Sequence, residues 1–220
     1  MGLLLSSVST SSGVVDDLVS GAAGTTAYWQ AEVFSLVWLA FCLPIVFYLL
    51  THPALLRRRL RGGPVGEPEP RQKIIVSLLL LCVAALFVVS VLDYDFGWSH
   101  VPVFVVLIGD LLVAGGLVLV LLVFRVNPFA AATVNVETEQ TVISRGPYAL
   151  VRHPMYSGGL LLFLGAPLAL GSWWGLVLFP PILVLIIWRL KNEETYLSTH
   201  LPGYRDYCAK VTHRLIPSIW

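Results

Sequence analysis

Two polar segments in this otherwise apolar chain contain the residue types that could form a small-molecule site. The first, residues 137–157, reads ETEQTVISRGPYALVRHPMYS, and the second, residues 188–214, reads WRLKNEETYLSTHLPGYRDYCAKVTHR. Both combine tyrosine, arginine and carboxylate side chains. Tyrosine and tryptophan rings can stack on a heterocycle or face a cation. The two segments are therefore the first candidates for a binding site.

Arg189 and Glu193 are four residues apart, a spacing that places both side chains on one face of a helix. The arginine offers a positive group for an anionic substrate. The glutamate beside it offers a negative group for an amine or for ribose hydroxyls. A site that holds a sulfonium compound next to an acidic or polar acceptor requires such parts.

A structural interpretation competes with this one. Tyrosine and tryptophan at the level of lipid headgroups usually form an interfacial belt, and arginine and lysine there usually act as anchors. That interpretation does not explain why polar clusters flank one short apolar region on both sides. The three cysteines, Cys42, Cys82 and Cys208, are too far apart in the sequence for a metal knuckle or a redox pair, and we expect no metal site.

The composition identifies an integral membrane protein. Of the 220 residues, 57% are hydrophobic and 12% are charged, and the mean hydropathy is +0.81. A soluble domain carries about 25% charged residues. We therefore expect membrane lipids and a lipophilic small molecule or prenylated substrate as partners. No glycine-rich nucleotide-binding fingerprint follows a predicted strand, so we expect no soluble nucleotide-binding domain. We also expect no nucleic acid partner.

The apolar stretches predict an all-α membrane protein with five transmembrane helices, at 28–50, 74–92, 101–124, 158–170 and 174–190. The last two come from one apolar run of 31 residues, too long for a single crossing of about 20 residues. The sequence GSWWG at 171–175 divides this run, so it predicts a short helical hairpin. Such a hairpin returns the chain to the same membrane face and brings the two polar segments together.

The basic residues predict the orientation. All fourteen lysines and arginines lie in three places: between the first and second predicted helices, after the third, and from the end of the fifth to the C-terminus. None lies in the N-terminal tail, the 93–100 loop or the 171–175 turn. The positive-inside rule then places the N-terminus outside and the C-terminus in the cytoplasm.

We divide the chain into a mobile N-terminal tail at 1–27, transmembrane helices 1–3 at 28–125, and a C-terminal module at 126–220 that comprises helices 4 and 5 and a cytoplasmic segment. Asp110 lies near the middle of the third predicted helix, where an ionisable group is costly. We expect it to face the bundle interior. There it either bonds a structural partner, such as a tyrosine hydroxyl or a backbone amide, or lines a substrate tunnel.

Four sequence elements follow one another in the C-terminal part of the chain: GPYALVRHPMYSGG, GSWWG, Arg189 with the Glu193–Glu194 pair, and HLPGYRDYCAKVTHRLIP. Together they resemble the isoprenylcysteine carboxyl methyltransferase family, which is grouped with the membrane phospholipid methyltransferases. The resemblance covers residues 137–217. It implies a membrane methyltransferase that takes S-adenosylmethionine as methyl donor in the cytoplasmic C-terminal module. Sterol reductases share a related C-terminal helical architecture, so fold alone does not determine the chemistry.

The resemblance also implies roles for individual residues. Arg189 would face the acceptor carboxylate and, with Glu193, would form the catalytic pair. Arg152 would be structural, paired with Glu194 or a backbone carbonyl. The residues implied to contact the donor are Gln140, Thr141, Val142, Ile143, Tyr148, His153, Tyr156 and Glu193, with Gln140 standing where eukaryotic members carry a histidine.

The acceptor stays open at this stage. A carboxylate is already ionised at neutral pH, so its methylation needs a cation to hold it and no general base. An amine must lose a proton to Glu193, Glu194 or His153, and a thiol must become a thiolate. A sterol-type reductase with a nicotinamide cofactor and a non-enzymatic membrane scaffold or transporter are the competing functions.

Overall fold

The computed structural model describes residues 28–67, 69–130, 133, 136 and 140–220. The predicted tail at 1–27 and residues 137–139 of the first polar segment lie outside this range. Among the described residues the regular structure is entirely helical, and no strand is present. The elements are α2 (Trp29–Thr51), α3 (Pro53–Leu60), α4 (Pro70–Phe96), α5 (Val103–Val126), the 3₁₀ helix η1 (Gly146–Ala149), α6 (Pro154–Ala169), the 3₁₀ helix η2 (Trp174–Leu178), α7 (Phe179–His200) and α8 (Tyr204–Lys210).

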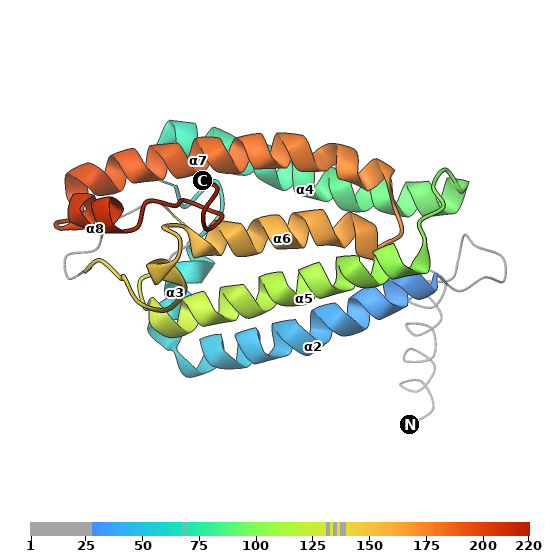
Figure 1. Ribbon diagram of the computed structural model, residues 1–220, viewed down its shortest axis with the longest axis horizontal. Coiled ribbons are helices and arrows are strands. Elements are labelled where there is room, and N and C mark those ends of the chain that lie inside the picture. The colour runs from blue at the N-terminus through green and yellow to red at the C-terminus, as the bar shows by residue number, and fades with distance from the viewer. Residues whose placement is uncertain (1–27, 68, 131–132, 134–135, 137–139) are drawn as a thin grey trace, which may run out of the picture.

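The five long helices lie side by side, with α2, α5 and α7 running one way and α4 and α6 the other (Figure 1). The short elements α3, η1 and α8 gather at one end of the bundle, which we call the polar end (Figure 1). The lysines and arginines of the sequence lie in these elements, in the adjoining loops and in the neighbouring parts of α4, α5 and α7. The opposite end carries Asp93 and Asp95 and no basic residue other than His100 among the described residues.

Four helical stretches are long and apolar enough to cross a membrane: Trp29–Thr51, Pro70–Phe96, Val103–Val126 and Trp174–His200. Helix α6 has 16 residues and a length of about 24 Å, against an apolar layer of about 30 Å. The predicted count of five spans is therefore not confirmed. The predicted division of the apolar run is confirmed, because α6 ends at Ala169 and η2 begins at Trp174.

Helices α5 and α6 approach at backbone distance through glycines. A Cβ atom placed on Gly109 would lie 2.3 Å from the backbone nitrogen of Ala169, and one placed on Gly116 would lie 2.7 Å from the carbonyl oxygen of Gly158. Small residues permit this contact in apolar surroundings, where packing and not hydrophobic exclusion holds helices together. The glycines thereby fix the position of α6, whose first turn enters the candidate site.

The turn between α6 and η2 is anchored to the end of α4 by a buried carboxylate. Asp93 is 1% exposed, and its Oδ2 accepts hydrogen bonds from Ser99 Oγ at 2.7 Å, from Ser172 Oγ at 2.5 Å and from the backbone nitrogen of Trp174 at 3.3 Å. These bonds connect three parts of the chain far from the polar end. They set the point from which α7 returns toward that end.

Candidate functional site

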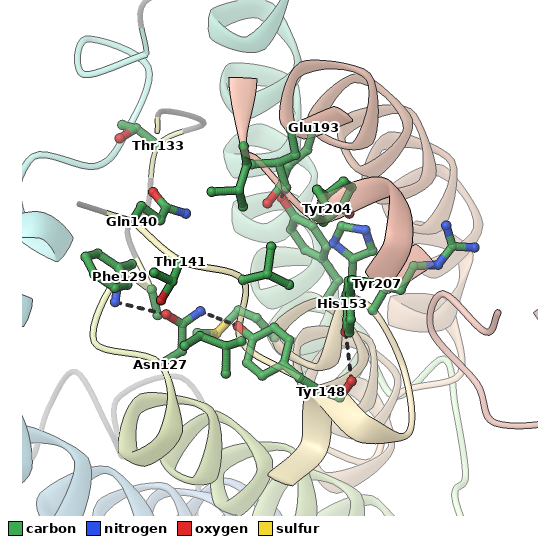
Figure 2. A pocket seen from close by; sticks show the side chains of 18 of the residues that line it. Asn127, Phe129, Thr133, Gln140, Thr141, Tyr148, His153, Glu193, Tyr204 and Tyr207 are labelled. Atoms are coloured by element: carbon green, nitrogen blue, oxygen red, sulfur yellow. Dashed lines mark hydrogen bonds between the residues drawn. The ribbon is translucent and has the colours of Figure 1, made fainter. Parts of the chain in front are cut away.

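One cavity at the polar end joins the two polar segments (Figure 2). Its volume is about 270 Å³, close to the lower end of the roughly 300–1,000 Å³ that ligand pockets occupy. Its walls come from the loop after α5, the extended stretch 140–143, η1, the start of α6, the C-terminal half of α7, α8 and Arg59 of α3.

Every residue that the sequence assigns to donor or acceptor binding lines this cavity. These residues are Gln140, Thr141, Val142, Ile143, Tyr148, His153, Tyr156, Arg189 and Glu193. Residues 140–156 and residues 189–193 are separated by the whole hairpin, and the fold brings them onto one surface. Their binding roles stay predictions.

Tyr156 connects the two halves of the site. Its hydroxyl donates a hydrogen bond to Glu193 Oε2 at 2.5 Å and accepts one from Arg189 Nε at 3.0 Å. Tyr156 belongs to the first turn of α6, and the other two residues belong to α7. This chain of contacts holds a carboxylate at the cavity wall in a fixed position.

The guanidinium of Arg189 is bonded within the chain. Its Nη2 donates to Glu67 Oε1 at 2.6 Å, and its Nη1 donates to Gln72 Oε1 at 3.1 Å. The side chains of Arg189 and Glu67 are 7% and 0% exposed. The loop that carries Glu67, between α3 and α4, contains glycines and prolines and suggests a flexible linker, so this ion pair was not predicted. An acceptor carboxylate at Arg189 would have to share the guanidinium with Glu67.

A second, partly buried network surrounds Glu194. Arg152 Nη1 lies 2.9 Å from Glu194 Oε1, and Arg214 Nε donates to Glu194 Oε2 at 2.9 Å. His153 Nε2 lies 3.3 Å from Glu194 Oε1. Arg152 also donates to the carbonyl of Thr212 at 2.9 Å. The predicted structural pairing of Arg152 is confirmed, and the network attaches the C-terminal segment to the start of α6.

Asn127 is a wall residue that the sequence analysis missed. Its Nδ2 donates to the hydroxyl of Tyr148 at 2.8 Å, and its Oδ1 accepts the backbone N–H of Phe129 at 2.9 Å (Figure 2). Burial raises the pKa of Tyr148 to about 12, although the bond from Asn127 acts in the opposite direction. Tyr148 therefore presents a neutral hydroxyl at physiological pH. The Asn127–Pro128 dipeptide, a common start of a turn, was the available signal.

Tyr204 and Tyr207 of α8 form an aromatic wall of the cavity (Figure 2). They are 4% and 6% exposed, and the hydroxyl of Tyr207 donates to the carbonyl of Tyr148 at 2.8 Å. Burial raises the pKa of both phenols. Together with Phe129, they provide flat apolar faces on which a heterocycle can stack.

Two further expectations concern single groups. No cluster of three or more metal-ligating side chains occurs in the described ranges, and the absence of a metal site stays a prediction. Asp110 is 6% exposed in the bundle interior, as expected. The predicted hydrogen-bond partner was wrong, because within the described part of the chain both of its carboxylate oxygens are buried without one. The apolar residues of α5 and the close α5–α6 packing leave few polar groups in this region.

The apolar helices are of membrane-spanning length, and they end at one polar cavity. These two features identify an integral membrane protein with a candidate small-molecule site. Residues 104–202 match the sequence model of the family described as phospholipid methyltransferase. The match includes all of α5 except Val103, both helices of the hairpin and all nine predicted site residues. It confirms the resemblance to the membrane methyltransferases over this stretch of the chain.

A curated relative points to a different chemistry. The mouse (Mus musculus) protein named Delta(14)-sterol reductase TM7SF2 is 30% identical over 108 residues, which are 44% of this chain and 25% of the relative. The chain thus spans about a quarter of the length of this relative. The match agrees with the resemblance to sterol reductases that the sequence analysis expected for the C-terminal helices.

Proposed function

We propose that the protein is an integral membrane methyltransferase that uses S-adenosylmethionine and methylates a lipophilic acceptor, with an isoprenylcysteine-type carboxylate as the favoured acceptor. The observation that carries this proposal is that Tyr148, Tyr156 and Glu193 line one common cavity, within the stretch that matches the methyltransferase family.

The cavity walls fit the chemical groups of the donor. An adenine needs flat apolar faces, which Phe129, Tyr204 and Tyr207 can supply. Ribose hydroxyls and an ammonium or sulfonium group favour a nearby carboxylate, which Glu193 supplies from a position fixed by Tyr156. The backbone of 140–143 lies outside any helix at the cavity wall and offers further hydrogen-bond donors and acceptors. The predicted donor contacts at Gln140, Thr141, Val142, Ile143 and His153 remain part of this proposal.

S-adenosylmethionine supplies a methyl group that its sulfonium leaving group has already activated. The chain contributes orientation and the exclusion of water, which align an acceptor with the methyl carbon. A carboxylate acceptor is ionised at neutral pH and needs only a cation to hold it. Arg189 stays the predicted holder, provided that the acceptor shares its guanidinium with Glu67.

A phospholipid amine is the alternative acceptor, and the name of the matching family favours it. An amine must lose a proton before or during transfer. Glu194 is already engaged by Arg152 and Arg214, so Glu193 is the better-placed carboxylate for this step. A small thiol is a third acceptor, and it requires thiolate formation only.

A sterol-type reductase is the competing enzyme, supported by the mouse relative. A nicotinamide dinucleotide phosphate would require basic side chains for its phosphates. Two of the arginines at the cavity, Arg152 and Arg189, are each ion-paired with a glutamate of the chain. This neutralisation favours the methyl donor over the dinucleotide.

The positive-inside rule supports a cytoplasmic location for the polar end and an external location for the start of α2. In that orientation the donor reaches the cavity from the cytoplasm, and the apolar part of the acceptor stays among the lipids. A membrane lipid or prenylated molecule is then the natural partner, and the C-terminal module acts as a cytoplasmic donor-binding unit.

The deciding experiment incubates the purified full chain with methyl-labelled S-adenosylmethionine and a total lipid extract. The proposal predicts a labelled lipid that is absent when the chain is omitted. Calorimetric titration with S-adenosylhomocysteine and with NADPH separates the two enzymes. Binding of NADPH alone would support the reductase, and binding of neither would support a scaffold.

A further inference from the structure

Helix α3 carries two adjacent arginines that each contact an aromatic ring in or just after the last turn of α5. The guanidinium carbon of Arg59 lies 5.1 Å from the centre of the Phe124 ring, and that of Arg58 lies 5.3 Å from the centre of the Phe129 ring. Both distances are within the range of a cation–π interaction. Leu55, which is 3% exposed, packs into the apolar core and fixes the same helix on the bundle. Helix α3 is therefore attached to α5 and to the loop that follows it.

The backbone beside the Phe129 ring is also held in place. Arg58 Nη1 donates a hydrogen bond to the carbonyl of Pro128 at 3.0 Å, and the backbone N–H of Phe129 donates to Asn127 Oδ1 at 2.9 Å. These two bonds use the C=O and the N–H of one peptide unit. Asn127 is in turn bonded to the hydroxyl of Tyr148 at 2.8 Å (Figure 2). The peptide that carries the Phe129 side chain is thus tied both to α3 and to the cavity wall.

Phe129 lines the cavity (Figure 2), and Arg58 is not one of the lining residues. Arg58 therefore acts on a bound molecule only through the ring that it contacts. An aromatic face binds more strongly when its orientation is already fixed, because no side-chain freedom is then lost on binding. Arg58 also lies outside residues 104–202, which match the family model, so this contact comes from the part of the chain that the match does not cover.

We propose that Arg58 is a positioning residue of the donor cavity, which holds the Phe129 ring in the orientation that stacks on the adenine of the methyl donor. This inference rests on the proposed function and adds a residue of α3 to the same site. The guanidinium lies against the ring and bonds the carbonyl that precedes it, so both the ring and its backbone are restrained. Such support from outside a site is what keeps a contacting side chain in its productive geometry.

The test measures the Kd of S-adenosylhomocysteine for the solubilised full chain by calorimetry. Phe129→Leu removes the stacking face and should raise the Kd about tenfold. Arg58→Gln removes the support of that face and should raise the Kd about fivefold. The matched control is Arg57→Gln, which removes the same charge from an exposed neighbour whose Nε bonds the carbonyl of Pro53 in its own helix. The control should leave the Kd unchanged.

The double variant separates positioning from a general structural role. If Arg58 acts through Phe129, then Arg58→Gln should change the Kd less than about twofold in the Phe129→Leu background. A purely structural role would lower the temperature of thermal unfolding and leave the Kd of the folded fraction unchanged. An equal rise of the Kd in both backgrounds would overturn the inference, because Arg58 would then act independently of the ring.

The remaining outcomes are equally decisive. A wild-type chain that binds S-adenosylhomocysteine, with Arg58→Gln or Phe129→Leu at the wild-type Kd, would overturn the inference and leave the proposed function standing. A wild-type chain that does not bind S-adenosylhomocysteine would refute the proposed function itself. Where Arg58→Gln does not fold, Arg58→Lys keeps the charge but loses the planar group. It should raise the Kd by less than Phe129→Leu does, and an unchanged Kd would count against Arg58.

Discussion

Substitution of Glu67 by glutamine should destabilise the protein, because Glu67 compensates the buried charge of Arg189. The carboxylate and the guanidinium are 2.6 Å apart, with side-chain exposures of 0% and 7%. Removal of one partner from a buried ion pair costs about 3–5 kcal/mol. Glutamine keeps an oxygen that can accept from Nη2, so we expect the lower value. At roughly 2–4 °C per kcal/mol for a chain of this size, the midpoint of thermal unfolding should fall by about 6–12 °C.

The same substitution should weaken donor binding. Arg189 without Glu67 will attract the carboxylate of Glu193, which is connected to it through the hydroxyl of Tyr156. Thermal unfolding and S-adenosylhomocysteine calorimetry on the solubilised full chain measure the two effects. Glu69→Gln is the matched control, because Glu69 lies in the same loop and is exposed.

A double-mutant cycle with Arg189→Gln tests the physical cause. If the two charges compensate each other, Arg189→Gln should cost about 0.5–3 kcal/mol less in the Glu67→Gln background than in the wild type. Additive effects would show that Glu67 acts independently of Arg189. Unfolding of Glu67→Gln at the same temperature as Glu69→Gln would refute the reasoning altogether.

Three other substitutions test separate parts of the account. Tyr156→Phe removes two hydrogen bonds to charged groups and should weaken S-adenosylhomocysteine binding about tenfold, as measured by calorimetry; an unchanged Kd would separate Tyr156 from the donor site. Gly116→Val should prevent stable folding because its side chain would meet the α6 backbone, whereas Gly115→Ala, with nothing within 4 Å of the added carbon, should be tolerated; equal melting temperatures would contradict the close packing. Asp93→Ala leaves buried hydrogen-bond donors unpaired and should lower the free energy of unfolding by about 1–3 kcal/mol or more, as measured by thermal unfolding. The Kd of S-adenosylhomocysteine for the folded fraction should not change. A loss of binding without a loss of stability would mean that we have placed the donor site at the wrong end of the bundle.

The features that the sequence predicted depend on local patterns. The division of the apolar run follows from its length and from the GSWWG turn, and the meeting of the polar segments follows from the hairpin. The pairing of Arg152 with Glu194 follows from that same meeting. The nine site residues themselves were implied by the family resemblance, and the single chain reversal at the hairpin explains why they lie on one cavity.

The features that it missed depend on contacts across the whole chain. Glu67 and Arg189 are 122 residues apart, and nothing in a loop rich in proline and glycine indicates a buried carboxylate. Arg59 reaches the cavity only because α3 turns back onto the end of the bundle. The start of α6 was also missed, because the helix begins at Pro154 within the first polar segment, four residues before the predicted apolar helix at 158–170.

The central claim is that residues 140–156 and the Glu193 region of α7 enclose one donor molecule. The most direct test is the Kd of S-adenosylhomocysteine for the wild type, Tyr148→Ala and Glu193→Gln, with Ser144→Ala as a control at an exposed position outside the cavity. We predict weaker binding for both cavity variants and an unchanged Kd for the control. Binding that is unaffected by either cavity substitution would contradict the claim.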